Sequence, residues 1–210
     1  MSRRLPIYIA IDTSGSMYGE PIQSVNVGLQ AMVHALRQDP YALDSVYLSI
    51  ITFDIKVKEI FPLTPLEQVQ VPDITCPKSG PTYMGEVLAL IVNRVDHDVV
   101  CSTPESKGDW RPMLFLMTDG SPSDRARFDE MVPEIKARHF AKIIACAAGP
   151  KAKDKYLKLL TDTVVSLDTT DSAAFASFFK WVSASVELGS VSTRETEQLP
   201  PPPKEIQFVI

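Results

Sequence analysis

Apolar and polar positions follow two different rhythms along this chain. Two apolar runs, residues 5–11 and 112–118, contain no charged residue, and an aspartate follows each of them at once. Uninterrupted runs of this length are typical of strands buried on both faces of a parallel sheet. Elsewhere, apolar residues recur at helical spacing. This second pattern predicts amphipathic helices over residues 20–36, 83–95, 123–138 and 171–188.

Strands that alternate with helices predict an α/β fold with a doubly wound, mostly parallel sheet and helices on both faces. Further strands are expected over residues 46–53, 140–148 and 164–167. Asp54 to Lys56 is short enough for a hairpin turn, and residues 57–61 alternate in polarity. They are therefore expected to form one antiparallel edge strand, which makes a six-stranded sheet.

The composition changes at Gly189. Polar residues follow, then four prolines at positions 200–203, which favour an extended polyproline II spacer. The last six residues are apolar and strand-prone. They could pack back on the domain, with residues 57–61 as one available sheet edge, or add to the sheet of a partner. We take residues 1–188 as the domain and expect residues 189–210 to be a separate interaction tail.

Oxygen-bearing side chains stand where the predicted strands end. Asp12, Ser14 and Ser16 follow the first buried strand, Asp119 follows the second, and Thr82 precedes a predicted helix. Ligands of open α/β sheets bind at the carboxyl ends of the strands. Hydroxyl and carboxylate oxygens suit a hard cation such as Mg²⁺. Each piece alone could instead be a capped turn or a helix cap, but the five together predict a divalent-cation site.

The three pieces together resemble the metal-ion-dependent adhesion site of von Willebrand factor A domains: Asp12-x-Ser14-x-Ser16, Thr82 and Thr118-Asp119-Gly120. The resemblance extends from about Leu5 to Leu188 and implies a Rossmann-like fold. It also implies direct ligation by Ser14, Ser16 and Thr82, with Asp12 and Asp119 acting through water. Mg²⁺ is the expected ion, with Mn²⁺ and Ca²⁺ as alternatives. A partner protein would supply an Asp or Glu to it.

Four large side chains adjoin these positions, namely Met17, Tyr18, Tyr83 and Met84. They fall in predicted loops or at a helix start, where a core role is less expected. Aromatic and methionine side chains are common at protein contacts. We therefore expect these four residues to form a partner-binding rim around the ion.

Composition narrows the class of protein. The 210 residues are 45% hydrophobic and 22% charged, with a net charge of −5, as in an ordinary soluble domain. The negative charge argues against nucleic acid as a partner. No apolar run approaches the ~20 residues of a membrane helix, and the start is too short for a signal peptide. We therefore expect no membrane partner and a cytoplasmic protein.

Enzyme signatures are weak. Neither Ser14 nor Ser16 has the flanking glycines of a hydrolase elbow, and no phosphate-binding Gly-Lys loop occurs. We therefore expect a protein that is not an enzyme, with a metal-dependent phosphatase as a distant alternative.

A single A domain with a tail is most similar to the bacterial TerY-type proteins of tellurite resistance. In that family the domain is linked to a protein kinase and a PP2C-type phosphatase, which implies a scaffold in stress-related phosphorylation signalling. The alternative is a subunit that works with an AAA+ ATPase in a chelatase-like assembly.

Overall fold

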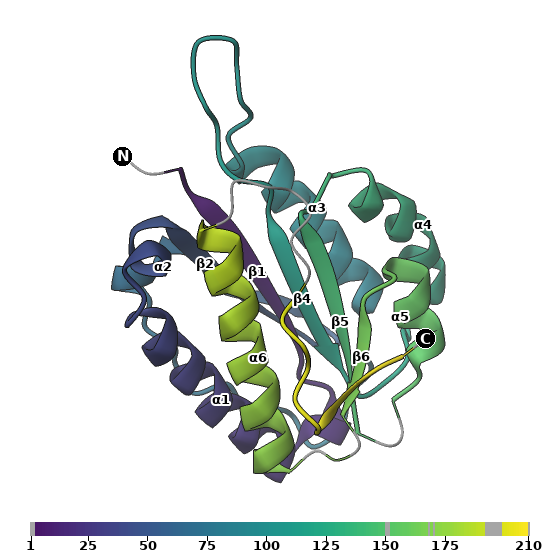
Figure 1. Cartoon of the computed structure of the whole chain (residues 1–210). Coiled ribbons are helices and arrows are strands. Elements are labelled where there is room, and N and C mark those ends of the chain that lie inside the picture. Colours follow the sequence, from purple (N-terminus) through teal and green to yellow (C-terminus); the bar gives the residue numbers. More distant parts are fainter. Residues whose placement is uncertain (1–2, 150–151, 168, 170, 192–198, 210) are drawn as a thin grey trace.

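A central β-sheet separates two layers of helices (Figure 1). The computed structural model describes residues 3–149, 152–167, 169, 171–191 and 199–209. Within these residues the strands form one sheet in the order β3-β2-β1-β4-β5-β6-β7. The strands are β1 (Leu5–Asp12), β2 (Val46–Phe53), β3 (Val57–Pro65), β4 (Met113–Thr118), β5 (Lys142–Ala148), β6 (Val164–Leu167) and β7 (Ile206–Phe208).

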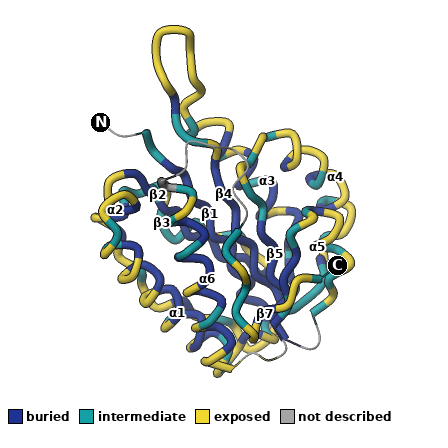
Figure 2. Tube along the Cα trace, in the orientation of Figure 1, coloured by how far each residue is buried: buried dark blue, intermediate teal, exposed yellow. Residues whose placement is uncertain are grey.

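The helices divide between the two faces of the sheet. Side chains of α1 (Glu20–Leu36), α2 (Pro40–Ser45) and α6 (Ser172–Val191) share one apolar core with the sheet. Those of α3 (Met84–Asp98), α4 (Arg125–Lys136) and α5 (Asp154–Leu160) share the other. Figure 2 shows the buried strands between helices whose outer surfaces are exposed. The predicted doubly wound α/β fold is thus confirmed. None of the helices described combines the length and apolar character needed to cross a membrane.

Strand β1 lies in the middle of this sheet, and its eight residues are all buried. It runs parallel to β2 on one side and β4 on the other. Asp12 pairs with Phe53 and Ile11 with Met117, so the ends of the three strands lie side by side. The sheet therefore brings the residues after β1, β2 and β4 to one edge.

The sheet has one strand more than predicted. Strand β3 is the expected antiparallel edge, but β7 forms a second antiparallel edge beside β6. Ile206 of β7 is only 3% exposed, and Trp181 of α6 donates a hydrogen bond to the Pro200 carbonyl (2.8 Å). The expectation of a separate tail is therefore wrong for residues 199–209, which pack on the domain at the edge away from residues 57–61. Residues 192–198 and 210 of the predicted tail lie outside the described residues.

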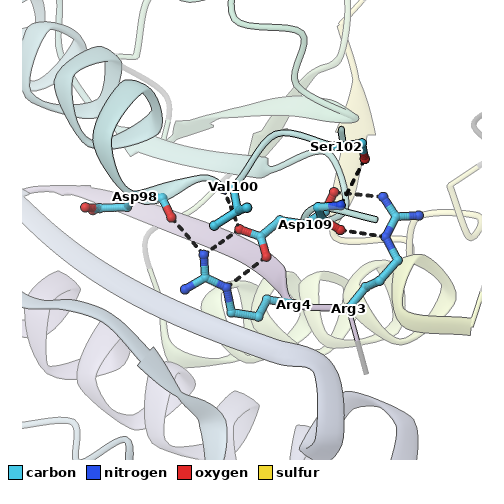
Figure 3. A network of polar contacts seen from close by, with 7 residues as sticks. Arg3, Arg4, Asp98, Val100, Ser102 and Asp109 are labelled. Carbon is cyan, nitrogen blue, oxygen red and sulfur yellow. Dashed lines mark hydrogen bonds and ion pairs between the residues drawn. The ribbon is translucent and has the colours of Figure 1, made fainter. Parts of the chain in front are cut away.

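The opposite end of β1 is held by an ion pair (Figure 3). Asp109 lies in the loop before β4, and its carboxylate accepts two hydrogen bonds from the Arg4 guanidinium (2.8 and 2.6 Å). Arg3 donates to the carbonyls of Gly108 and Asp109 (2.8 Å each) and stacks on Trp110. This loop therefore lies at the end of β1 away from Asp12, as the order of elements predicts.

Candidate metal centre

Asp12 is the innermost residue of the predicted site. It ends β1 and is 0% exposed. Its Oδ1 accepts a hydrogen bond from the Ser14 backbone N–H (2.7 Å), and its Oδ2 accepts one from the Thr118 hydroxyl (2.5 Å). Because each carboxylate oxygen already has a partner, Asp12 is placed to act from behind the neighbouring hydroxyls.

The electrostatics of Asp12 follow from this burial. Loss of solvent raises its pKa to about 6, while the hydrogen bonds from Thr118 and Ser14 act in the opposite direction. The negative charge of Asp119 raises the pKa further. The donors to Asp12 are uncharged, so the carboxylate is satisfied as a hydrogen-bond acceptor without being neutralised. A cation placed nearby would stabilise the charged form.

A chain of oxygens leads from this carboxylate to the surface. Ser14 Oγ lies 3.2 Å from Ser16 Oγ, and Ser16 Oγ donates to Asp119 Oδ1 (2.8 Å). Neighbouring ligands of an octahedral Mg²⁺ lie about 3 Å apart, because each is about 2.1 Å from the ion at a right angle. The 3.2 Å between the two serine oxygens therefore suits one edge of such an octahedron.

Thr82 is held in place by its backbone. Its N–H donates to Ser123 Oγ (3.1 Å), and its carbonyl accepts from the Ser123 N–H (2.8 Å). A Cβ added to Gly120 would lie 3.2 Å from Thr82 Oγ1 and 3.9 Å from Asp12 Oδ2. Glycine at this position lets the loop after β4 (residues 119–124, the third loop of the site) lie against the Thr82 hydroxyl. The structure thus brings Thr82 to the same end of β1 as the other four predicted residues.

The loop after β1 (residues 13–19, the first loop of the site) and the loop before α3 (residues 79–83, the second loop) also meet directly at Gly15. A Cβ there would lie 2.4 Å from Ser79 Cα, which is too short for any real contact. Gly15 therefore lets the loop before α3 close over the first loop, and it links residues that are far apart in the sequence.

Three residues near the site have roles that the sequence pattern did not assign. Thr118 orients Asp12, and Ser123 holds Thr82. The third is Asp54, which is 8% exposed and whose carbonyl accepts a hydrogen bond from the Tyr83 N–H (2.9 Å). Asp54 had an available signal, because it follows β2 and the end of β2 lies beside the end of β1.

The predicted rim is half wrong. Met17 and Met84 are each 0% exposed and pack into the two cores, one on either face of the sheet. The short 3-10 helix η1 (Gly15–Met17) turns Met17 inward, and Met84 is the first residue of α3. Tyr18 is 52% exposed and Tyr83 is partly exposed, so these two residues are the ones available to a partner.

The donor set also limits which metals fit. Within the described part of the chain, no group of three His, Cys, Asp or Glu residues could hold an ion. Any ion at this edge would therefore depend on hydroxyl oxygens, which suit hard cations such as Mg²⁺ rather than metals that prefer imidazole or thiolate.

Comparison with known proteins agrees with this geometry. The family model of the von Willebrand factor type A domain matches residues 7–180. No curated protein sequence matches the chain. Among solved structures, proximal thread matrix protein 1 from the mussel byssus, with a zinc-occupied MIDAS motif, has a TM-score of 0.63 at 20% identity. The alignment covers 87% of this chain and 48% of that one.

Two microbial structures have the same fold. A von Willebrand factor type A protein from Catenulispora acidiphila has a TM-score of 0.63 at 17% identity, over 89% of this chain and 43% of that one. The ArnB paralog VWA2 from Sulfolobus acidocaldarius has a TM-score of 0.59 at 15% identity, over 86% and 45%. The chain thus spans less than half the length of these three structures.

Proposed function

Because the chain belongs to the von Willebrand factor type A family, we propose that it is a divalent-metal-dependent protein-binding module. The observation that carries the proposal is the meeting of hydroxyl and carboxylate oxygens at one edge of the sheet, with Ser16 Oγ 3.2 Å from Ser14 Oγ and 2.8 Å from Asp119 Oδ1. The zinc-occupied MIDAS motif of the mussel protein supports a divalent ion at the matching residues.

Three neutral hydroxyls would hold the ion directly, those of Ser14, Ser16 and Thr82. Asp12 and Asp119 would act from behind, through water. The hydrogen bonds that Asp12 accepts from the Ser14 N–H and the Thr118 hydroxyl support this role. Mg²⁺ fits the oxygen set and its tendency to retain water. Mn²⁺ and Ca²⁺ accept similar ligands and are the alternatives.

The partner would complete this coordination. Neutral ligands leave most of the charge of a divalent ion uncompensated, so an anionic sixth ligand is favoured. An Asp or Glu of a partner protein would supply that ligand, and an ion held by Ser14, Ser16 and Thr82 would act as the Lewis acid for it. Two aromatic side chains beside the site would border the contact, the exposed Tyr18 and the partly exposed Tyr83.

The cellular setting is proposed from the resemblance to TerY-type proteins, supported by the sequence Ser79-Gly80-Pro81-Thr82-Tyr83-Met84-Gly85 of the second loop. In this setting the protein is a cytoplasmic scaffold between a kinase and a PP2C-type phosphatase in tellurite or stress resistance. The alternative is an AAA+ ATPase partner. Neighbouring genes for a kinase and a phosphatase would favour the first, and a gene for an ATPase the second.

We propose no catalytic role for these residues. A phosphatase of the haloacid type would carry a second Asp where this chain has Ser14. Metal-dependent phosphatase activity is therefore the distant alternative, and a colorimetric phosphate-ester assay with Mg²⁺ tests it.

Titration calorimetry with Mg²⁺ and Mn²⁺ tests the ion site. We expect one ion per chain for the wild type and at least a tenfold loss of affinity in Thr82→Ala and Asp12→Ala, since each removes an oxygen of the site. Thr103→Ala is the matched control, because Thr103 lies in the loop at the opposite end of β1. Equal ion binding by all four proteins would refute the site.

A further inference from the structure

The turn between β2 and β3 lies at the same edge of the sheet as the metal loops. Asp12 pairs with Phe53, and the Thr13 N–H donates to the Phe53 carbonyl (2.8 Å). Asp54, Ile55 and Lys56 therefore emerge directly beside the first metal loop. The sequence pattern predicts this turn only as the link between two antiparallel strands.

Asp54 fixes this turn to two of the loops that would hold the ion, the loop after β1 and the loop before α3. Its carboxylate accepts the Lys56 N–H (2.8 Å) within the turn and lies 3.4 Å from the Thr13 hydroxyl of the first loop. Its carbonyl accepts the Tyr83 N–H (2.9 Å), next to the ligand Thr82. The turn is thus held by a nearly buried side chain, and its position relative to the ion site is set by hydrogen bonds.

The apex of this fixed turn carries an aliphatic side chain followed by a cation. Ile55 is 55% exposed, and Lys56 is exposed beside it. Lys78 is a second exposed cation at this edge, since its carbonyl lies 3.0 Å from the position of a Cβ on Gly15. A single exposed isoleucine is ordinary. An isoleucine on a turn fixed by hydrogen bonds, with a lysine next to it and an oxygen-lined cation site at the same edge of the sheet, presents apolar surface together with positive charge.

We propose that Ile55 and Lys56 select the partner segment that reaches the ion. The occupant is an acidic stretch of a partner protein in which an aliphatic residue lies within about three positions of the metal-reaching Asp or Glu. That aliphatic side chain packs on Ile55, and a second acidic residue pairs with Lys56. The inference rests on the proposed function, because the ion anchors the segment. Charge complementarity favours this occupant, since the carboxylate that suits the ion also brings negative charge towards both lysines.

An array of synthetic peptides tests the proposal with the full chain and Mg²⁺. Each peptide carries one Asp or Glu in a Gly-Ser background, with or without a leucine two residues away and a second glutamate. We expect the wild type to bind the leucine-containing peptides about fivefold to tenfold more tightly. Ile55→Ser should remove that preference, and Lys56→Ser should remove the preference for the second glutamate.

The controls separate this inference from the proposed function. Val27→Ser changes an equally exposed aliphatic residue on α1, and its peptide preferences should match those of the wild type. If no peptide binds in a Mg²⁺-dependent way, or Thr82→Ala binds like the wild type, the proposed function fails. If binding depends on Mg²⁺ but Ile55→Ser keeps the leucine preference, only the inference about the turn is overturned. Thermal unfolding of each variant confirms that it is folded.

Discussion

Two shielded aspartates lie at opposite ends of β1, and they differ in whether a protein side chain neutralises the negative charge of the carboxylate. The Asp109 side chain is 6% exposed, and it accepts two hydrogen bonds from Arg4, which directly precedes the strand. Asp12 is 0% exposed and ends the strand. Its donors are the Ser14 N–H and the Thr118 hydroxyl, and neither carries a charge.

The difference lies in what each carboxylate still lacks. At Asp109 a guanidinium satisfies the hydrogen bonds and neutralises the charge, and the contact raises the pKa of Arg4. At Asp12 only the hydrogen bonds are satisfied, and burial raises the pKa of the carboxyl to about 6. At one end of β1 the charge of the aspartate is therefore neutralised by a protein side chain. At the other end the hydrogen-bond donors leave the charge of Asp12 uncompensated, and a cation could neutralise it.

The largest effect on stability is expected from replacing Arg4, the cation that pairs with Asp109. Arg4→Met keeps much of the apolar stem but leaves Asp109 shielded without its partner, which costs about 3 kcal/mol of unfolding free energy. Urea titration and thermal unfolding at pH 7 measure this loss. Arg127→Met is the control, since the Arg127–Glu130 pair is exposed and solvent-screened and should contribute far less to stability. Equal losses in both variants would contradict the comparison.

Neutralising the other aspartate should have the opposite sign. In excess chelator at pH 8 we expect Asp12→Asn to be as stable as the wild type or more stable, by on the order of 2 kcal/mol, because it no longer buries an unneutralised charge. Its amide can still accept from Ser14 and donate to the Thr118 hydroxyl. Saturating Mg²⁺ should raise the melting temperature of the wild type only. A large destabilisation of Asp12→Asn in chelator would show that the charge of Asp12 already stabilises the fold without an ion, and it would contradict the comparison.

The same contrast predicts a pH dependence. The pKa of Asp12 is raised to about 6 in the folded chain, above its ordinary value of 3.8. The folded chain therefore binds the proton more tightly than the unfolded chain does. In chelator, the contribution of Asp12 to stability is largest below about pH 4 and is lost as the pH rises through 6, by about 1 kcal/mol between pH 5 and 7. The measure is the difference in unfolding free energy between the wild type and Asp12→Asn, which should be smallest near pH 4, widen as the pH rises through 6 and level off above pH 7.

A substitution at Gly120 separates the geometry of the site from its charge and should leave stability almost unchanged. Gly120→Ala would place a Cβ 3.2 Å from Thr82 Oγ1, so the hydroxyl must move by a few tenths of an ångström. We expect a threefold to tenfold loss of Mg²⁺ affinity, up to about 1.4 kcal/mol, with little change in stability in chelator. Calorimetry measures the affinity, and Gly80→Ala is the control because the nearest atom to its Cβ would be 3.7 Å away. Unchanged affinity in Gly120→Ala would indicate that Thr82 is not held against the third loop.

Much of the metal end could be predicted because its signals are local. Asp12 and Asp119 each follow an uninterrupted apolar run, and parallel strands put both ends at one edge. Met17 and Met84 were misassigned because nothing in the sequence reports which way a short 3-10 turn or a first helical residue points. Both side chains turn into the core.

The other end gave no comparable signal. Arg4 and Asp109 are 105 positions apart, and charged residues in a polar loop are usually solvated. The last six residues are strand-prone, but the pairing of β7 with β6 was not predicted, because it depends on which edge the finished sheet leaves open. Pairings between distant segments depend on the fold rather than on any local pattern.

The separation in sequence between the metal loops has a consequence for the order of events in folding. Ser16 and Asp119 are 103 residues apart, and they meet only after β4 has docked beside β1. A partly folded chain without β4 therefore has no complete site, and an ion cannot stabilise it. We predict that this contact forms after the rate-limiting step of folding, so that a bound ion slows unfolding and leaves the folding rate nearly unchanged. In kinetic terms, the ion would bind only after β4 has paired with β1, and it would raise the barrier to unfolding.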